Sequence, residues 1–121
     1  MQKILIILLI VLIPCYALAK KNEKYYQTLH CQELEGEIEH RLQDRTRIDC
    51  LTKNEAIEHD WAKKWAECIG QALYYGAVKD KTPVCVLIGS KAEFDKFSLK
   101  IKLTAEHYNL PIKIIHIEKE E

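Results

Sequence analysis

The N-terminal segment determines how much of this chain is available for folding. Lys3 precedes an unbroken apolar run at residues 4–13, and an A-x-A motif follows, ending at Ala19. An early positive charge, a short apolar stretch and small residues at the end are typical of a secretory signal. We therefore predict a signal peptide at residues 1–19 and an exported mature chain at residues 20–121, acting in the periplasm or outside the cell.

An uncleaved membrane anchor is the alternative interpretation of this segment. Pro14 and the Lys20-Lys21 pair would then lie at its outer end. The apolar run is shorter than the roughly 20 residues that cross a bilayer, which favours the signal. Pro14 directly before Cys15 disfavours lipidation of that cysteine. We expect no stable membrane span in the mature chain.

The mature chain has the size and charge of one ordinary domain. Roughly one hundred residues form a single hydrophobic core and fold alone. In the whole sequence the 18 basic residues balance the 18 acidic ones, and the formal net charge stays near zero once Lys3 is removed with the signal. No overall field then attracts nucleic acid or an anionic membrane, and any polyanionic partner must be held by local groups.

Four cysteines follow the predicted cleavage point, at positions 31, 50, 68 and 85. An even number in an exported chain is compatible with two disulfides, and four cysteines allow three pairings that the sequence does not separate. The alternative is that they are free, buried hydrophobic side chains, because Cys50 and Cys85 lie in apolar runs. Both interpretations stay open, and the spacing does not indicate a zinc site.

Periodicity and turn residues predict the order α-β-β-β-α-β-α-β. A helix over 22–34 should end at Gly36, and three runs at 37–42, 46–51 and 55–60 should form a meander of strands. Asp60 is a candidate N-cap for a helix over 61–75 that ends near Gly76. The remaining expected elements are a strand at 82–88 buried on both faces, a helix from a capping box at Ser90 to about residue 108, and a last strand at 112–117. The fold class is therefore α/β, a single domain with a mixed sheet flanked by helices.

Two acidic residues lie within apolar strand runs. Asp49 and Glu58 would be costly there without a partner, and arginines at nearby positions are the ordinary solution. The alternative is that Asp49 and Glu58 converge with Glu37 or Glu39 on a divalent cation. Carboxylate oxygens suit Mg²⁺, which keeps several of its waters.

The helix that follows carries one polar edge. At about 100° per residue, Lys64, Cys68, Gln71 and Tyr75 fall on a narrow arc beside the predicted core face. Such an edge is also common where long side chains extend from a core boundary to solvent. His59 alternates to the sheet face opposite Glu58 and is predicted to be a packing residue.

Taken together, these residues resemble the PD-(D/E)xK nuclease superfamily, in particular a small exported bacterial branch. The resemblance covers about residues 36–88 and implies a restriction-endonuclease-like αβββαβ core with an added helix and strand. It implies that Asp49 and Glu58 bind Mg²⁺ or Mn²⁺, that Lys64 acts on the attacking water, and that Gln71 and Tyr75 face nucleic acid.

One position departs from the superfamily pattern. The lysine usually found two residues after the glutamate is replaced by Asp60, and Lys64 on the following helix is the candidate substitute. The leading hypothesis is therefore a Mg²⁺-dependent nuclease that hydrolyses phosphodiesters. The alternative is a binding or adaptor module that keeps the fold without turnover.

Overall fold

A computed structural model describes residues 20–121, so the predicted signal peptide at 1–19 lies outside the described residues. The order of elements is the one expected from the sequence. They are α1 (Glu23–Glu33), β1 (Glu37–Arg41), β2 (Arg47–Leu51), β3 (Glu55–Trp61), the short 3₁₀ helix η1 (Ala62–Lys64), α2 (Trp65–Lys79), β4 (Thr82–Gly89), α3 (Lys91–Tyr108) and β5 (Lys113–Glu118). No helix within 20–121 is long and apolar enough to cross a membrane.

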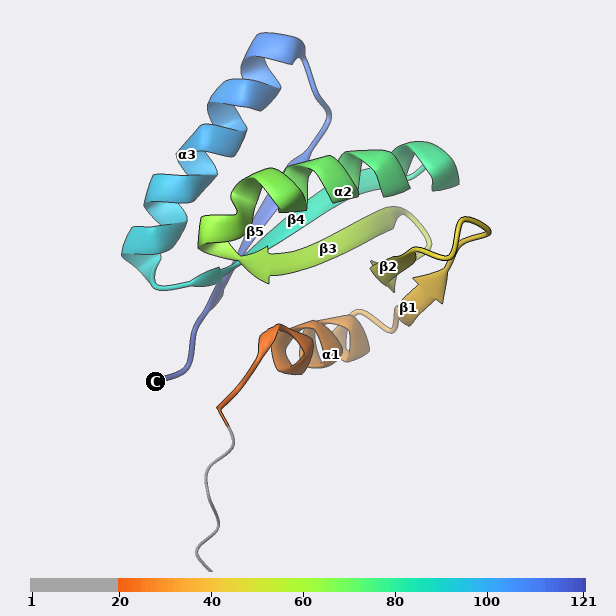
Figure 1. Ribbon diagram of the computed structural model, residues 1–121, viewed down its shortest axis with the longest axis horizontal. Helices are drawn as coiled ribbons and strands as arrows, with labels where there is room; N and C mark the ends of the chain where they lie inside the picture. The colour runs from red at the N-terminus through yellow and green to blue at the C-terminus, as the bar shows by residue number, and fades with distance from the viewer. Residues whose placement is uncertain (1–19) are drawn as a thin grey trace, which may run out of the picture.

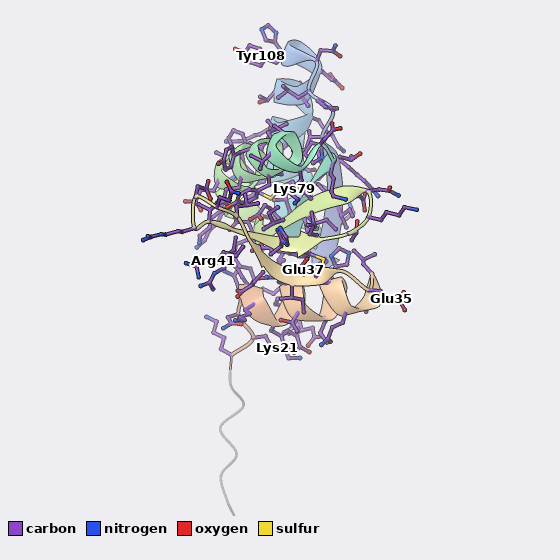
Figure 2. The ribbon with its side chains drawn as sticks, turned by 90° about the vertical axis from the view of Figure 1, so that its right-hand side faces the viewer. Lys21, Glu35, Glu37, Arg41, Lys79 and Tyr108 are labelled. Carbon is purple, nitrogen blue, oxygen red and sulfur yellow. A yellow bond between two sulfur atoms is a disulfide. The ribbon has the colours of Figure 1, made fainter. Side chains whose placement is uncertain are left out.

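The five strands form one mixed sheet in the order β1-β2-β3-β4-β5. β1, β2 and β3 pair antiparallel in sequence, whereas β3 with β4 and β4 with β5 pair parallel. Helix α1 covers one face of the sheet, and α2 and α3 cover the other (Figures 1 and 2). The α/β class and the single mixed sheet are thus confirmed.

Strand β4 lies at the centre of the core. Its residues alternate between the two faces, so Val84 and Val86 pack beneath α1, whereas Cys85 and Leu87 pack beneath α2 and α3. All four side chains are fully buried. The prediction of a strand buried on both faces is therefore confirmed.

Two disulfides join helices to strands, one on each face of the sheet. Cys31 of α1 bonds Cys50 of β2, and Cys68 of α2 bonds Cys85 of β4. The Cα–Cα separations are 5.6 and 5.7 Å, within the usual range for a disulfide. The structure therefore selects disulfides over free cysteines, and disulfides are typical of proteins in oxidising compartments.

The two glycines predicted to end helices have other roles. Helix α1 is followed by Glu35, which adopts the left-handed conformation at φ 54°, and α2 runs through Gly76 to a left-handed Asp80. A Cβ on Gly36 would lie 2.5 Å from the Cys50 sulfur, and one on Gly76 would lie 2.9 Å from the Lys81 carbonyl oxygen. Both glycines make room for neighbouring atoms instead of ending a helix.

The start of α2 also differs from the prediction. β3 continues to Trp61 through parallel pairing with β4, and α2 begins only at Trp65, after η1. Neither η1 nor α2 has a side-chain N-cap. Asp60 is therefore a buried strand residue, and its interpretation as a helix cap is wrong.

The capping box of α3 is confirmed. Glu93 N–H donates to the Ser90 hydroxyl at 3.1 Å, and Ser90 N–H donates to the Glu93 carboxylate at 3.1 Å. These two bonds satisfy N–H groups that the first turn of a helix leaves without partners.

Candidate functional site

The candidate site lies where β2 separates from β3. These strands pair at Cys50 with Ile57 and at Leu51 with Ala56, and β3 then continues for four further residues. β2 instead stays with β1 as far as Arg47. The two strands therefore form a fork, and its branches begin at Asp49 and Glu58.

Side chains replace the strand hydrogen bonds at this fork. The N–H of Asp49 donates to Glu58 Oε1 at 3.0 Å, and the N–H of His59 donates to Asp49 Oδ2 at 2.8 Å. Gln27, buried in α1, donates from Nε2 to the carbonyl oxygen of Asp49 at 3.0 Å. Both backbone groups of Asp49 are thus satisfied by side chains, as partly buried polar groups require.

Glu58 and Asp49 form a pair of neighbouring carboxylates. Glu58 is 4% exposed, and the Asp49 side chain is 23% exposed. Burial and then the charge of Asp49 raise the pKa of Glu58 to about 9, against the opposing hydrogen bond from Asp49 N–H. The pair therefore retains a proton at neutral pH in the absence of a cation.

Asp60 is a further acid beside this pair. Burial and then the charge of Glu23 raise its pKa to about 7, while Lys64 acts in the opposite direction. The charge of Asp60 in turn raises the pKa of Glu58. Alternation along β3 places Asp60 on the same face as Glu58. The sequence contains this spacing, but it indicates a shared face only if Asp60 belongs to the strand and not to a helix cap.

The two predicted acids of β1 have basic partners. Glu37 lies 2.9 Å from His40 Nδ1. Glu39 contacts Arg47 at 3.3 Å and Lys24 at 3.6 Å. At the sheet edge, Glu39 is therefore engaged in ion pairs with Arg47 and Lys24, and Glu37 lies beside His40.

Lys64 lies in η1, next to Asp60 and α1. Its Nζ is 3.3 Å from Glu23 Oε1, and the Glu23 hydrogen bond, followed by the charges of Glu23 and Asp60, raises its pKa. The charge of Asp60 acts on both Lys64 and Glu58, but within residues 20–121 the side-chain partner of Lys64 is Glu23, and no contact joins Lys64 to Asp49 or Glu58.

The two predicted substrate-binding residues of α2 lie in different environments. Gln71 is exposed, whereas Tyr75 is buried against Ile48 and Ala56. Burial raises the pKa of Tyr75, and the charge of Glu58 adds to this effect. Tyr75 therefore lies within electrostatic reach of the fork, and Gln71 is at the surface.

His59 lies on the opposite face from Glu58, as alternation predicts. In the register with β4, His59 is opposite Val86, beneath α1, and Glu58 is opposite Cys85, beneath α2. His59 Nε2 is 2.8 Å from His30 Nδ1 of α1. Sequence reasoning missed this partner, because periodicity gives the face of a residue and not what covers it.

Within residues 20–121, no group of three or more His, Cys, Asp or Glu side chains is arranged to hold a metal ion. No model of a known protein family, no curated protein and no solved structure matches this chain. The chemistry of the site is therefore inferred from its own residues.

Proposed function

We propose that this chain is a Mg²⁺-dependent nuclease of the PD-(D/E)xK type that acts in the periplasm or outside the cell. The observation that carries the proposal is the Asp49–Glu58 pair at the fork of β2 and β3. Two neighbouring carboxylates, one almost fully buried, are costly in their ionised form unless a cation lies beside them. Within residues 20–121, neither Asp49 nor Glu58 forms an ion pair with a lysine or arginine, and the single basic side chain within 4 Å of either carboxylate is His59, 3.7 Å from Asp49.

The donor set suits a hard divalent cation. Mg²⁺ is commonly held by one or two carboxylates and completes its shell with waters and substrate phosphate oxygens. Asp49 and Glu58 would hold Mg²⁺, or Mn²⁺ in its place. When bound, such an ion neutralises phosphate charge and lowers the pKa of a bound water.

Lys64 would provide the cation that acts beside the scissile phosphate. Its present partner is Glu23, and both side chains are partly exposed. Ion pairs of this kind contribute only about 0–1 kcal/mol, so a phosphodiester can compete with Glu23 for the ammonium group. Tyr75 would orient groups within the fork, and Gln71 would contact nucleic acid at the surface.

The arrangement of elements supports the same proposal. An initial helix, three antiparallel strands, a helix and a parallel strand make up the α-β-β-β-α-β order of a restriction-endonuclease-like core, to which α3 and β5 add one helix and one strand. The two disulfides suit the proposed location outside the cytoplasm.

A binding or adaptor module without turnover is the second candidate. Its support is that Asp60 occupies the usual lysine position and that Glu23 already binds the substitute Lys64. Such a module would keep the carboxylate pair and bind a metal ion or nucleic acid without cleaving it.

Cleavage of plasmid and single-stranded nucleic acid by the purified protein separates these candidates. We expect cleavage with Mg²⁺ or Mn²⁺. The cleavage rate should fall roughly 100-fold or more in Asp49→Asn and in Glu58→Gln, because electrostatic stabilisation of the transition state contributes strongly to such reactions. Lys64→Ala should also be impaired. Glu106→Gln, an exposed residue of α3, is the matched control.

Metal binding is measured in parallel by calorimetry with Mn²⁺. Binding that depends on Asp49 and Glu58 without any cleavage would favour the binding module. Residual cleavage equal in all variants, with no metal binding, would overturn the nuclease proposal.

A further inference from the structure

A cavity lies at the carboxyl ends of β3 and β4, beside η1. Its volume is about 350 Å³. It is lined by Lys20, Lys21, Asn22, Trp61, Lys63, Ile88, Gly89, Glu93 and Lys119. Figure 1 shows that the residues before α1, the tip of β3, the start of α3 and the C-terminal end lie at this end of the sheet.

This cavity is distinct from the carboxylate fork. Trp61 follows Asp60 in β3 and points to the opposite face, where its ring packs edge-on against Tyr26 of α1, with centroids 6.0 Å apart. The fork belongs to the face covered by α2. A ligand in the cavity would therefore contact η1, the residues that precede α1 and the first turn of α3 without touching Asp49 or Glu58.

The lining of the cavity is strongly basic, although the chain as a whole is neutral. Four lysines and one glutamate give it a formal charge of four minus one, or +3, against zero for the whole sequence. Lys21 pairs with Glu120, and the Glu93 carboxylate accepts the N–H of Ser90. Within residues 20–121, Lys20, Lys63 and Lys119 form no ion pair, and Glu93, on which the charges of Lys63 and Lys119 act, offsets only one of the positive charges of the lining.

These lysines come from three distant parts of the chain and surround an apolar surface. Lys20 precedes α1, Lys63 lies in η1, and Lys119 follows β5 with its Nζ 5.5 Å from the centre of the Trp61 ring. Trp61 and Ile88 provide the apolar part of the lining. Convergent charges over an apolar wall are the pattern of a small-ligand site, and the volume lies within the usual range.

We propose that this cavity binds a phosphate monoester, carried by a small organic molecule or by the end of a nucleic-acid strand. Three ammonium groups match a phosphate dianion better than a singly charged carboxylate, and lysine binds phosphate as a point charge. Trp61 and Ile88 would contact the organic part of the ligand. The carboxyl ends of parallel strands are also where open α/β sheets commonly bind ligands.

Calorimetric titration of the purified protein tests the site, without added metal. The probes are inorganic phosphate, a nucleoside 5′-monophosphate, and one oligonucleotide with either a 5′-phosphate or a 5′-hydroxyl. We expect saturable binding of the monophosphate and weaker binding of inorganic phosphate, which lacks the organic part. Preference for the phosphorylated oligonucleotide over the monophosphate would identify a strand end as the source of the phosphate, and the reverse would identify a small molecule.

Charge-removing variants assign the binding to this cavity. Lys63→Gln combined with Lys119→Gln should weaken binding about tenfold or more, because it removes two of the three ammonium groups that face the phosphate. Lys102→Gln, an exposed lysine of α3, should leave binding unchanged. Absence of saturable binding, or equal affinity in both variants and the wild type, would overturn the proposal. Asp49→Asn should still bind phosphate, so the outcome is independent of the nuclease proposal.

Discussion

The backbone N–H of Asp49 donates to Glu58 Oε1 at 3.0 Å, where an antiparallel ladder would offer a carbonyl oxygen. The Asp49 carboxylate in turn accepts the N–H of His59. The two acids therefore stabilise the separation of β2 from β3. Their positions are fixed by the fold before any ligand arrives, as a preorganised site requires.

Replacement of Glu58 should change how stability depends on pH. Its pKa of about 9 lies above the ordinary value of 4.5, so the folded chain keeps a proton that the unfolded chain releases. Stability should therefore be greatest at low pH for this group and fall as pH rises to about 9. Asp60, with a pKa of about 7 and Glu23 and Lys64 beside it, acts with the same sign.

The titration of His30 has the opposite effect on stability and acts at acidic pH. Burial lowers its pKa below the ordinary 6.5, so acidification through that range destabilises the folded chain. The effect of Glu58 should therefore be clearest from about pH 7 to 9. Urea denaturation at several pH values in this window should show falling midpoints for the wild type and a flatter profile for Glu58→Gln. An unchanged slope in the variant would contradict the assignment.

Removal of Gln27 should destabilise the fork from the side of α1. Gln27→Ala leaves the carbonyl oxygen of Asp49 without its donor, at a cost of about 1–3 kcal/mol. Denaturation midpoints measure this loss, and metal affinity should fall as Asp49 becomes less well fixed. Gln32→Ala, an exposed residue of the same helix, is the control. Equal midpoints for the two variants would exclude a structural role for Gln27.

Each disulfide should contribute to stability separately. The cysteines are 19 and 17 residues apart, and loops of this length correspond to about 3 kcal/mol each in the loop-entropy model. Cys31→Ala with Cys50→Ala, and Cys68→Ala with Cys85→Ala, should each lower the denaturation midpoint. Mass spectrometry of the unreduced protein should show the other disulfide intact. No change in midpoint in either double variant would contradict the pairing.

Gly36→Ala should destabilise the chain through the first disulfide. The added Cβ would lie 2.5 Å from the Cys50 sulfur and 2.8 Å from the Cys31 sulfur. Overpacking of this kind costs about 1–3 kcal/mol. In a Cys31→Ala, Cys50→Ala background the sulfurs are absent, so the penalty should be much smaller, and a double-mutant cycle measures the difference. An equal penalty in both backgrounds would show that the backbone, and not the disulfide, requires glycine.

Local patterns in the sequence predicted the order of elements but not the details of the fork. Strand alternation and the Ser90 capping box depend on neighbouring residues, and the structure confirms both predictions. The predicted start of α2 is wrong, because the spacing of Trp61 and Trp65 suits a helix, whereas pairing with β4 keeps Trp61 in the strand. Hydrogen bonds from Gln27 and Glu58 to Asp49 join distant segments and leave no periodic signal.

The pairing of the cysteines also depends on contacts between distant segments, which the sequence pattern does not reveal. Four cysteines permit three connectivities, and the choice depends on which helix covers which face of the sheet. The same holds for the acids. The sequence permits either Glu37 or Glu39 as a partner of Asp49, whereas in the structure Glu37 lies beside His40 and Glu39 beside Arg47. Site residues on one strand are therefore easier to predict than their partners on another.

The two disulfides crosslink only part of the molecule. Both crosslinks lie between residues 31 and 85, whereas α3 and β5 are held by noncovalent packing, such as the stacked Phe94 and His116 rings 4.5 Å apart. Local opening in proteins begins where such restraints are fewest. Amide hydrogens of residues 91–118 should therefore exchange with solvent by detachment of α3 and β5, while the crosslinked remainder stays folded.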